Sequence, residues 1–551
     1  MKSEMYSKEV MKHFLHPKSM GKIKNPSGEG SAGNMVCLLP EEKIHKNSEC
    51  IEIHELKKLQ KVLTHTGDYK KIVASSSRNY NGKIVTLKNK LGKISLTPEH
   101  LVYAISIPKK RKFLRNKNKR NLTPAWYHAE QLKKGDISLY PKLKVEENIE
   151  DIEIKIPRRK WDFRSREIPE KIPLNSDLLR LFGYFLSEGN IQDKPCRTFI
   201  SFTLNIKEKE IVEDIKKISK KLFGLNIKIR EIPQRKTSYV YLFNAKLARF
   251  FKELFGNGAE FKKIPNFIMN LPAENQKSLI LALWKGDGYV NLNRNGPRAG
   301  YSTISYQLAQ QIKTLLLRQA IVPSIYVEKE RKTNGVNHKK SYRIHIGQRD
   351  SLKKLCEILK IKYNPKSYVS IDSWFSENYL YTPITGKKIS NYIGIVNNLE
   401  VENSHSFISE AFCLHNCGDV MQLFIKVKEN KKTGKRIISD IKFQTFGCVI
   451  AIANSSMVTT MVKGKTIEQA LKITKDDVLK KLGKVPPIKV HCSILAIDAL
   501  DEAIYDYLKK KNLPIPEKLR ETHERISKGL TELEHRHGEY LELEKEVYEK
   551  K

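Results

Sequence analysis

Apolar and polar positions change their spacing several times along the chain of 551 residues. Residues 420–428 and 437–446 alternate between apolar and polar side chains, which is typical of half-buried strands, and residues 429–434 supply a turn between them. Apolar residues recur at helical spacing in four segments: 6–14, 448–463, 466–473 and 492–510. The pattern predicts a hairpin with several helices, and a highly charged helix beyond about residue 515.

The middle of the chain has a different pattern, with dense lysine and short alternating strands such as 82–87. Within it, residues 178–189 and 278–288 form two similar apolar stretches, each ending in an acidic residue followed by glycine. A single acidic–Gly pair is an ordinary end of a helix. Two of them after matched apolar stretches indicate a repeated unit, with Glu188 and Asp287 at equivalent places.

Composition narrows the class of protein. A chain of this length predicts about three or four domains. With 40% apolar residues, no run of 18 apolar residues and no signal-peptide core, we expect a folded cytoplasmic protein without a membrane partner. Eight cysteines in so long a chain do not look like a disulfide framework, so reactive or metal-binding thiols are the better interpretation.

The net charge of +40 is unevenly distributed. Residues 1–36 and 417–551 together hold 32 basic and 23 acidic residues, a net charge of +9. Residues 37–416 hold 69 basic and 38 acidic residues, a net charge of +31. This excess favours a polyanionic partner over a merely solvated lysine-rich surface. DNA is therefore the expected partner of the middle segment.

Joining the two flanks restores a series of motifs in the order 33–36 with 417–419 (Gly-Asn-Met-Val-Cys-Gly-Asp), 446–448 (Phe-Gly-Cys) and 491–496 (His-Cys-Ser-Ile-Leu-Ala). Together with the opening segment 5–14, these motifs closely resemble the IscU/NifU family of iron–sulfur cluster scaffolds. The resemblance covers both flanks to about residue 510. It departs from the family at Met35, where proline is usual.

The resemblance implies that Cys417, Cys448 and Cys492 hold an iron–sulfur cluster of the [2Fe-2S] type, with one position left open for assembly and transfer. Asp419 would weaken cluster retention, and His491 would be a fourth ligand or its neighbour. Zinc is an alternative occupant of such a site. The partners implied are a cysteine desulfurase and cluster-acceptor proteins.

The middle segment begins at Cys37 and ends in His-Asn416 directly before Cys417, and these ends resemble the splice junctions of an intein. The Cys37 thiol can attack the preceding carbonyl and turn the amide into a thioester, which Cys417 then takes over. The Asn416 amide can cyclise onto its own carbonyl and release the insert, and an S-to-N shift leaves Val36 joined to Cys417. Both thiols are expected to be partly exposed. Each of these features is weak evidence alone. The two ends of the insert, however, meet at one point of the scaffold motif, and removal of the insert restores that motif.

By the same resemblance, four residues support splicing: Thr97, His100, His405 and His415. The first two form a T-x-x-H block that would polarise or distort the amide at Cys37. The two later histidines lie in the terminal blocks, and the last would assist cyclisation of Asn416 as an acid–base group. Asn398 departs from the aspartate that many inteins have here, which leaves the coordination of the first two steps open.

The insert at 37–416 is longer than the splicing blocks require, and its acidic–Gly helices resemble the paired LAGLIDADG helices of homing endonucleases. The resemblance implies that Glu188 and Asp287 meet at the helix ends and bind Mg²⁺ for phosphodiester cleavage. The family lysine fits either Lys262 or Lys263. Basic strands would lie along DNA.

The predicted architecture is multidomain α+β. An IscU-like α/β scaffold is split by an all-β, Hint-type splicing domain, which carries a LAGLIDADG endonuclease domain of αββαββα repeats. The expected boundaries, from N-terminal flank to C-terminal flank, are 1–36, 37–170, 171–375, 376–416 and 417–551. Two alternatives stay open: an insert that has lost splicing, and a DNA-binding regulator with a redox-sensing metal site.

Overall fold

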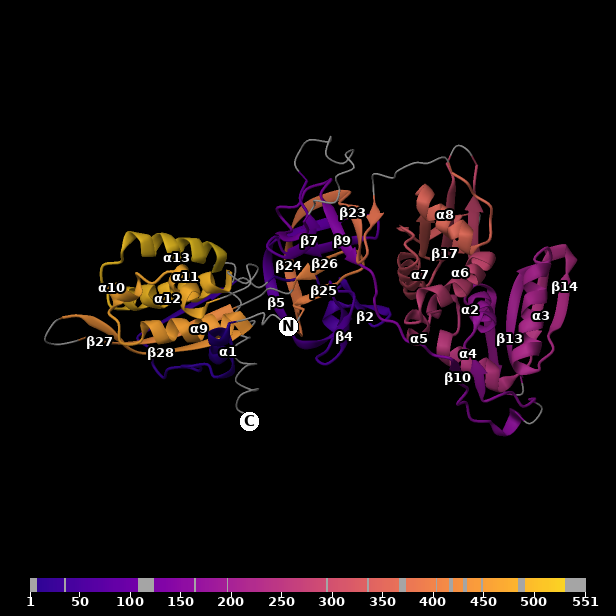
Figure 1. The fold of residues 1–551 in the computed structure, drawn as a ribbon, viewed down its shortest axis with the longest axis horizontal. Helices are drawn as coiled ribbons and strands as arrows, with labels where there is room; N and C mark the ends of the chain where they lie inside the picture. Colours follow the sequence, from indigo (N-terminus) through magenta and orange to yellow (C-terminus); the bar gives the residue numbers. More distant parts are fainter. Residues whose placement is uncertain are drawn as a thin grey trace.

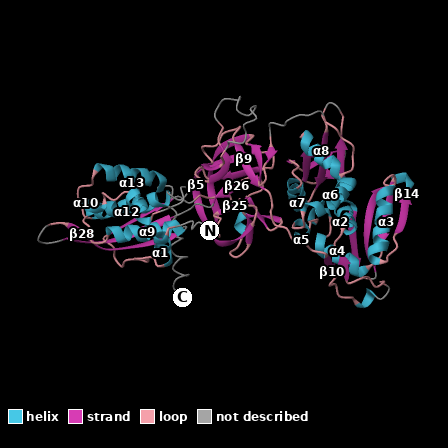
Figure 2. Cartoon of the chain, in the orientation of Figure 1, coloured by secondary structure: helices cyan, strands magenta, loops and turns pink. Residues whose placement is uncertain are grey.

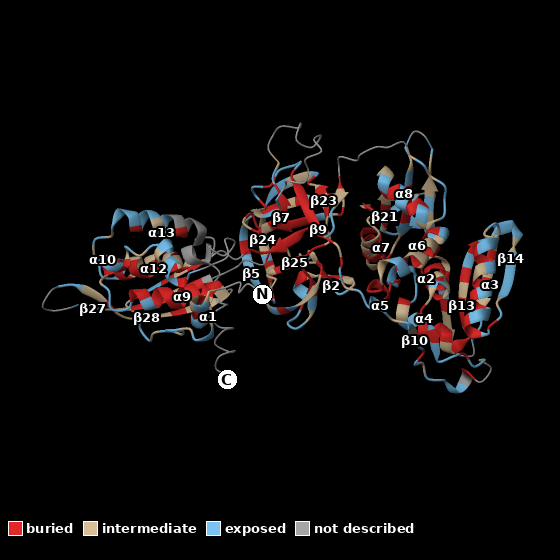
Figure 3. Cartoon of the chain, in the orientation of Figure 1, coloured by how far each residue is buried: buried red, intermediate tan, exposed pale blue. Residues whose placement is uncertain are grey.

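The computed structural model describes residues 7–33, 36–107, 123–162, 165–195, 197–293, 296–333, 336–365, 373–402, 404–415, 420–429, 434–446, 449–483 and 491–530. They form three units: an α/β unit built from both ends of the chain, an all-β unit, and an α/β unit around a pair of helices (Figures 1 and 2). Each unit has its own buried apolar core (Figure 3). No helix in the described ranges is long and apolar enough to cross a membrane.

Both ends of the chain build the first unit. Its antiparallel sheet has the order β1-β27-β28, with β1 at Gly28–Gly33, β27 at Val420–Glu429 and β28 at Arg436–Phe446. Its helices are α1 (Lys8–Leu15), α9 (Val449–Val462), α10 (Ile467–Ala470), α11 (Lys475–Leu482), α12 (His491–Lys510) and α13 (Glu517–Leu530). The hairpin and the helices expected from apolar spacing are present, and α11 is an additional helix.

Strand β1 joins the N-terminal flank to the C-terminal flank. Gly33 is paired with Val420, and Gly28 with Ile425. A Cβ atom on Gly30 would overlap the backbone of Ala503 in α12, so glycine allows this helix to lie directly on the strand. The glycine-rich N-terminal stretch is therefore a packed strand, and the two flanks fold as one unit.

The all-β unit contains two sheets. The six-stranded sheet contains β2 (Lys43–Lys46), β3 (Glu49–Glu52), β4 (Lys61–Leu63), β5 (Tyr69–Lys88), β6 (Lys93–Leu96) and β24 (Gly386–Val401). The seven-stranded sheet contains β7 (Leu101–Ile105), β8 (Ala125–His128), β9 (Ile137–Pro141), β22 (Trp374–Phe375), β23 (Tyr379–Pro383), β25 (Ser406–Ile408) and β26 (Cys413–His415). A short 3₁₀ helix, η1 (Ile53–Glu55), follows β3.

Each of these sheets contains strands from both ends of the insert. β24 pairs with β5 from Gly386 opposite Lys88 to Val401 opposite Ile72. β23 pairs with β9, and β26 pairs with β7. The two ends of the insert therefore complete one β unit, and the chain between them emerges as the third unit.

The third unit repeats one order of elements around two helices. Its first half contains α2 (Ser176–Glu188), β12 (Gly189–Lys194), β13 (Arg197–Asn205), α3 (Lys209–Phe223), β14 (Lys228–Ile232), η5 (Pro233–Arg235), β15 (Thr237–Leu242) and α4 (Ala245–Phe255). After η6 (Ala259–Phe261) and α5 (Asn266–Met269), its second half contains α6 (Ala273–Asp287), β16 (Gly288–Asn291), β17 (Arg298–Thr303), α7 (Tyr306–Arg318), β18 (Ser324–Glu328), β19 (Arg331–Thr333), β20 (Val336–His338), β21 (Ser341–Ile346) and α8 (Arg349–Ile358). The expected αββαββα order is present, and the hairpin β19–β20 is an insertion in the second half.

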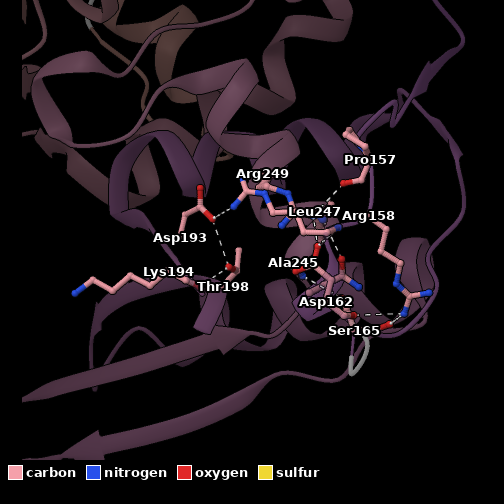
Figure 4. Close-up of polar contacts among 12 residues, drawn as sticks. Pro157, Arg158, Asp162, Ser165, Asp193, Lys194, Thr198, Ala245, Leu247 and Arg249 are labelled. Carbon is pink, nitrogen blue, oxygen red and sulfur yellow. Dashed lines mark hydrogen bonds and ion pairs between the residues drawn. The ribbon is translucent and has the colours of Figure 1, made fainter. Parts of the chain in front are cut away.

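The third unit begins earlier than the expected residue 171. The hairpin of β10 (Asp151–Glu153) and β11 (Lys171–Pro173) encloses η4 (Lys160–Asp162), and its isoleucines belong to the core of the third unit. Within this segment, Asp162 forms a buried ion pair with Arg249 of α4 (Figure 4). Arg249 also donates to the carbonyl oxygen of Pro157 at 3.2 Å. At the other end, β22 pairs with β23, so residues 374–375 belong to the all-β unit.

Candidate functional sites

The start of the insert lies between two strands of the all-β unit. Leu38 is bridged to Leu96 at the end of β6 and to Asn397 in β24. The Leu38 amide donates to the Asn397 carbonyl at 2.8 Å, and the Asn397 amide donates back to the Leu38 carbonyl at 2.8 Å. This pairing fixes the backbone of the preceding residue, Cys37.

Thr97 and His100 both contact Cys37. The Cys37 amide donates to Thr97 Oγ1 at 3.1 Å, and the Thr97 amide donates to the Cys37 carbonyl at 3.0 Å. His100 Nδ1 lies 3.3 Å from the same carbonyl oxygen. Thr97 thus bonds the amide that joins Val36 to Cys37, whereas His100 bonds the carbonyl of the next peptide.

Burial determines the charge of this site. Cys37 is only 1% exposed, contrary to the expected partial exposure, because it is packed among apolar side chains of β5 and β24. His100 is fully buried, and this burial lowers its pKa to about 4, against a weaker opposing effect of the bond to Cys37. Its ring is therefore neutral near pH 7. Within the described part of the chain, His100 Nε2 has no hydrogen-bond partner, which leaves it available as a proton acceptor.

The end of the insert lies in the seven-stranded sheet of the same all-β unit. Strand β26 places His415 opposite Leu101, the residue after His100, and opposite Ser406 on β25. The His415 ring is buried edge-on against Trp126, with 4.9 Å between ring centres. Neighbouring Cys413 is also buried, which raises the pKa of its thiol and makes it a poor competing nucleophile. Asn416 and Cys417 lie outside the described residues.

His405 has an acidic partner that the sequence analysis did not identify. Its Nδ1 lies 2.9 Å from Glu400 Oε1, and its ring centre lies 6.4 Å from that of His415. The φ of His405 is 47°, a left-handed conformation that is uncommon for residues other than glycine. Asn398, which stands where many inteins have an aspartate, is 7% exposed and carries no charge. The carboxylate that this strand does provide is that of Glu400, two residues further along β24.

A second site lies where α2 and α6 end side by side. A Cβ atom on Gly183 would lie 2.5 Å from the Cβ atom of Ala282, and one on Gly286 would overlap Ser187. Small residues thus allow close contact between the helices. α2 ends at Glu188 and α6 ends at Asp287, and in each case the following glycine begins a strand.

The two carboxyl groups resist ionisation in this position. Burial raises the pKa of Glu188 to about 7, with the Asp287 charge as a further cause. Burial also raises the pKa of Asp287. Two oxygen donors that are partly buried and mutually repulsive are well suited to a divalent cation such as Mg²⁺, because its charge compensates theirs.

Lys262 belongs to this site and Lys263 does not. Lys262 is 6% exposed, and its Nζ donates to the Ser187 carbonyl at 2.9 Å. Burial lowers its pKa to about 8, against the attraction of the two acidic groups. Lys263 points away and pairs with Glu49 of the all-β unit at 3.5 Å. The two adjacent lysines could not be told apart in sequence, because nothing but packing separates them.

Tyr301 is a further member of the site that the sequence analysis did not identify. It is fully buried in β17, and its hydroxyl donates to Asp287 Oδ2 at 3.5 Å. Ser187 Oγ lies 3.4 Å from the same hydroxyl and donates to the Leu283 carbonyl at 3.1 Å. The hydroxyl groups therefore link the ends of α2 and α6 below the carboxylates.

The sheet of the first half has an exposed face suited to nucleic acid. Residues 228–231 of β14 are exposed and include Lys228 and Arg230. On the adjacent strand, the rings of Tyr239 and Tyr241 are stacked with centres 6.3 Å apart, and Phe243 continues the stack at 5.9 Å. Cations combined with stacked aromatic rings can contact phosphates and bases.

The third site, in the first unit, is described only in part. Val420 at the start of β27 is paired with Phe446 at the end of β28, so the motifs next to these residues adjoin the same end of the hairpin. His491 and Cys492 are the first residues of α12. Cys417, Asp419 and Cys448 lie outside the described residues. His523 of α13 lies 3.0 Å from Glu502 of α12 through its Nδ1.

Two family models match the chain. Residues 397–513 match the NifU-like N-terminal domain. Residues 175–256 and 274–360 match the LAGLIDADG-like domain, one match for each half of the third unit. These matches confirm the predicted resemblance to both families.

Curated proteins match different shares of the chain. The iron–sulfur cluster assembly scaffold protein IscU 1 of Archaeoglobus fulgidus is 52% identical over 133 residues, which are 23% of this chain and 78% of that protein. An uncharacterized protein of Methanocaldococcus jannaschii is 31% identical over 421 residues, or 70% of this chain. The ATP-dependent DNA helicase Hel308 of Thermococcus kodakarensis is 26% identical over 422 residues, also 70% of this chain. This chain spans 51% of the Methanocaldococcus protein and 36% of the helicase.

Among solved structures, I-DmoI in complex with DNA and calcium is similar over 34% of this chain and 90% of the I-DmoI chain, at 15% identity and a TM-score of 0.26. The folds and motifs together define a cluster-scaffold domain whose sequence is interrupted by a LAGLIDADG domain. The chain belongs to the IscU family of iron–sulfur cluster assembly scaffold proteins.

Proposed function

We propose that residues 37–416 are an intein that excises itself and joins Val36 to Cys417, leaving an IscU scaffold made of segments 1–36 and 417–551. The pairing of Gly33 with Val420 carries this proposal, because the flanks already form one sheet with the insert looped out between them. Two relatives with different names, one of them a helicase, each match 70% of this chain. The segment 37–416 makes up a similar share of the sequence, which favours a mobile element.

The first step is attack of the Cys37 thiol on the Val36 carbonyl. The C–N bond breaks as the C–S bond forms, and the proton lost by the thiol is balanced by the one gained by the leaving nitrogen, which becomes the free α-amine of Cys37. Thr97 Oγ1 accepts a hydrogen bond from this nitrogen at 3.1 Å and holds the peptide in place. Neutral His100, with Nδ1 on the Cys37 carbonyl, fixes the orientation of the nucleophile and can accept a proton at Nε2.

Transfer of the acyl group to Cys417 and cyclisation of Asn416 complete the proposed reaction. Cyclisation forms a bond from the Asn416 side-chain nitrogen to its own carbonyl carbon and breaks the bond to Cys417. His415 directly precedes Asn416 in the chain, and the ring of His405, oriented by Glu400, lies 6.4 Å from the ring of His415. An S-to-N shift then forms the Val36–Cys417 amide.

The trapped first intermediate tests this function. In a chain with Asn416→Ala and Cys417→Ala, a thiol such as dithiothreitol should cleave at Cys37 and release the segment 1–36. Addition of Thr97→Ala should slow this cleavage by about tenfold, as expected for a lost buried hydrogen bond. Resistance of the trapped chain to the thiol would contradict the proposal.

We further propose that the third unit cleaves DNA at a specific site. Glu188 and Asp287 would hold a divalent cation, which supplies charge stabilisation and an activated water when bound. The pKa of Lys262 is lowered to about 8, close to neutral pH, so its amine could exchange a proton or stabilise developing negative charge. The basic sheet and the +31 charge of the insert would hold the phosphate backbone, with affinity that falls as salt rises.

The joined reading frame provides the substrate for this test. A duplex that encodes segment 1–36 fused to segment 417–551 should be cut near the fusion point with Mg²⁺ present, and not with EDTA. Glu188→Gln and Asp287→Asn should remove cleavage, whereas Lys263→Gln should retain it because Lys263 lies outside the site. Cleavage by the two acidic-site variants at the parent rate would contradict the assignment.

After splicing, Cys417, Cys448 and Cys492 would bind an iron–sulfur cluster, with Asp419 and His491 beside it and zinc as an alternative occupant. Cysteine desulfurase and cluster-acceptor proteins would be its partners. Since Cys417 is also a splicing nucleophile, the unspliced chain should be a poor scaffold. The paired flanks favour this function over a single DNA-binding regulator.

A further inference from the structure

Helix α7 of the LAGLIDADG unit is docked on the all-β unit (Figure 1). Gln307 accepts a hydrogen bond from the Cys50 amide at 3.2 Å and donates to the Ser48 carbonyl at 2.9 Å. At the other end of the helix, Leu317 belongs to the apolar core of the all-β unit. Arg318 donates to the Val145 carbonyl at 3.0 Å. The helix is thus bound near both of its ends by groups of the other unit.

A fully buried lysine lies at the centre of this contact. Lys313 has no exposed surface, and its Nζ donates to the carbonyl oxygen of Glu410 at 2.5 Å. The same Nζ lies 5.6 Å from the ring centre of Tyr140. The hydroxyl of Tyr306, at the start of α7, donates to the Glu410 carboxylate. Burying a cation is costly, so this bond fixes α7 and Glu410 in one arrangement.

Glu410 belongs to the turn that leads into the C-terminal end of the insert. The turn connects β25 to β26, and β26 ends at His415, directly before Asn416. The opposite side of the turn is held by Asn89, whose side-chain amide donates to the Ala411 carbonyl at 2.8 Å. Lys313 and Asn89 therefore hold the turn from two sides and fix the register of β26 against β7.

The N-terminal end of the insert does not depend on α7. Cys37 is held by Thr97, by His100 and, through Leu38, by β24, and all of these lie within the all-β unit. A change in α7 should therefore affect one end of the insert and spare the other.

We propose that the LAGLIDADG unit is a structural part of the C-terminal splice site, with Lys313 as a positioning residue for Asn416 cyclisation. This inference rests on the proposed splicing function. It assigns the DNA-cleaving unit a second role that does not require DNA or metal. Removal of the Lys313 bond leaves the Glu410 carbonyl without its donor and lets the turn and β26 shift relative to His415.

The test measures the two ends of the insert separately in the full chain. In a Cys37→Ala background, only Asn416 cyclisation cuts the chain, and Lys313→Met should slow that cleavage by about tenfold, as for a lost charge-assisted hydrogen bond. Tyr306→Phe keeps the helix packing and should slow it by about threefold. Thr314→Ala is the matched control, because the Thr314 hydroxyl donates within its own helix, to the Gln310 carbonyl.

Thiol-induced cleavage at Cys37, in the Asn416→Ala, Cys417→Ala background, should stay within about twofold for all three variants. Equal loss at both ends would assign Lys313 to folding in general and overturn the inference, as would unchanged Asn416 cyclisation in both Lys313→Met and Tyr306→Phe. A parent chain that cleaves at neither end would instead overturn the splicing function, and the inference with it.

Discussion

Glu188, Asp287 and Lys262 occupy a partly buried region that disfavours charge on each of them. Burial raises the pKa values of the two carboxyl groups and lowers that of the lysine, and the attractions between opposite charges offset only part of this effect. Such opposed shifts are frequent where proteins bind cations or transfer protons. They also have a consequence for stability that can be measured without DNA.

The Glu188 carboxyl predicts that the LAGLIDADG unit loses stability as pH rises. Its pKa is raised from 4.5 to about 7, so between these values the folded state holds a proton that the unfolded state has lost. The free energy of unfolding should decrease across this window, by about 2 kcal/mol for this partly buried group, and level off above it. Hydrogen exchange of amides in α2 and α6, in the splicing-blocked chain, measures the change.

Glu188→Gln should remove most of this pH dependence and make Mg²⁺ less stabilising near pH 8. Glu213→Gln, an exposed change on α3, should leave both effects as in the parent. The same slope in Glu188→Gln as in the parent would exclude this carboxyl as its source.

The pair of Glu400 and His405 predicts a role for a residue outside the splicing motifs. Glu400→Gln retains an oxygen for His405 Nδ1 but removes the carboxylate charge that strengthens this hydrogen bond, so Asn416 cyclisation should slow by about three- to tenfold. The rate is measured by C-terminal cleavage in the Cys37→Ala chain. Glu402→Gln, an exposed neighbour, is the control, and equal rates in the two variants would contradict the role of Glu400.

At the scale of elements, α2 and α6 depend on small residues where they cross. Gly183→Ala would place a Cβ atom 2.5 Å from that of Ala282 and 2.9 Å from the Leu279 carbonyl oxygen. The helices must then separate, which should lower the free energy of unfolding of this unit by about 1–3 kcal/mol. Thermal unfolding of the splicing-blocked chain gives the measurement.

Gly386→Ala serves as the control for this change, since a Cβ atom there would meet only Lys88 at 3.6 Å, an ordinary contact. A transition of the Gly183→Ala chain at the temperature of the control would mean that the helices do not meet as closely as described.

Much of the element pattern could be predicted from the sequence, because apolar spacing is a local property. The hairpin of β27 and β28 and the acidic ends of α2 and α6 follow from it. The docking of α7 does not, because Lys313 looks like any solvated lysine until Glu410 lies beside it. Glu400 likewise gains its role only when the chain after β24 turns back and brings His405 to it.

At the scale of the whole molecule, the chain is organised as units enclosed within one another. The two flanks share the sheet of the first unit, and the two ends of the insert share the two sheets of the all-β unit. The LAGLIDADG unit is in turn inserted into the chain of the all-β unit. The order of the family motifs predicted that the flanks belong together. It could not predict which strands from the two ends of the insert pair with each other, since that depends on residues far apart in the sequence.

Intact mass spectrometry of the expressed chain tests the central claim most directly. The parent should give a ligated scaffold, in which segment 1–36 is joined to segment 417–551, and a free insert that spans 37–416. The two masses fix both junctions, at Cys37 and at Cys417. A chain with Asn416→Ala and Cys417→Ala should not give the ligated product. A single uncut species of 63.7 kDa from the parent would contradict self-excision and leave an IscU scaffold with a disabled insert.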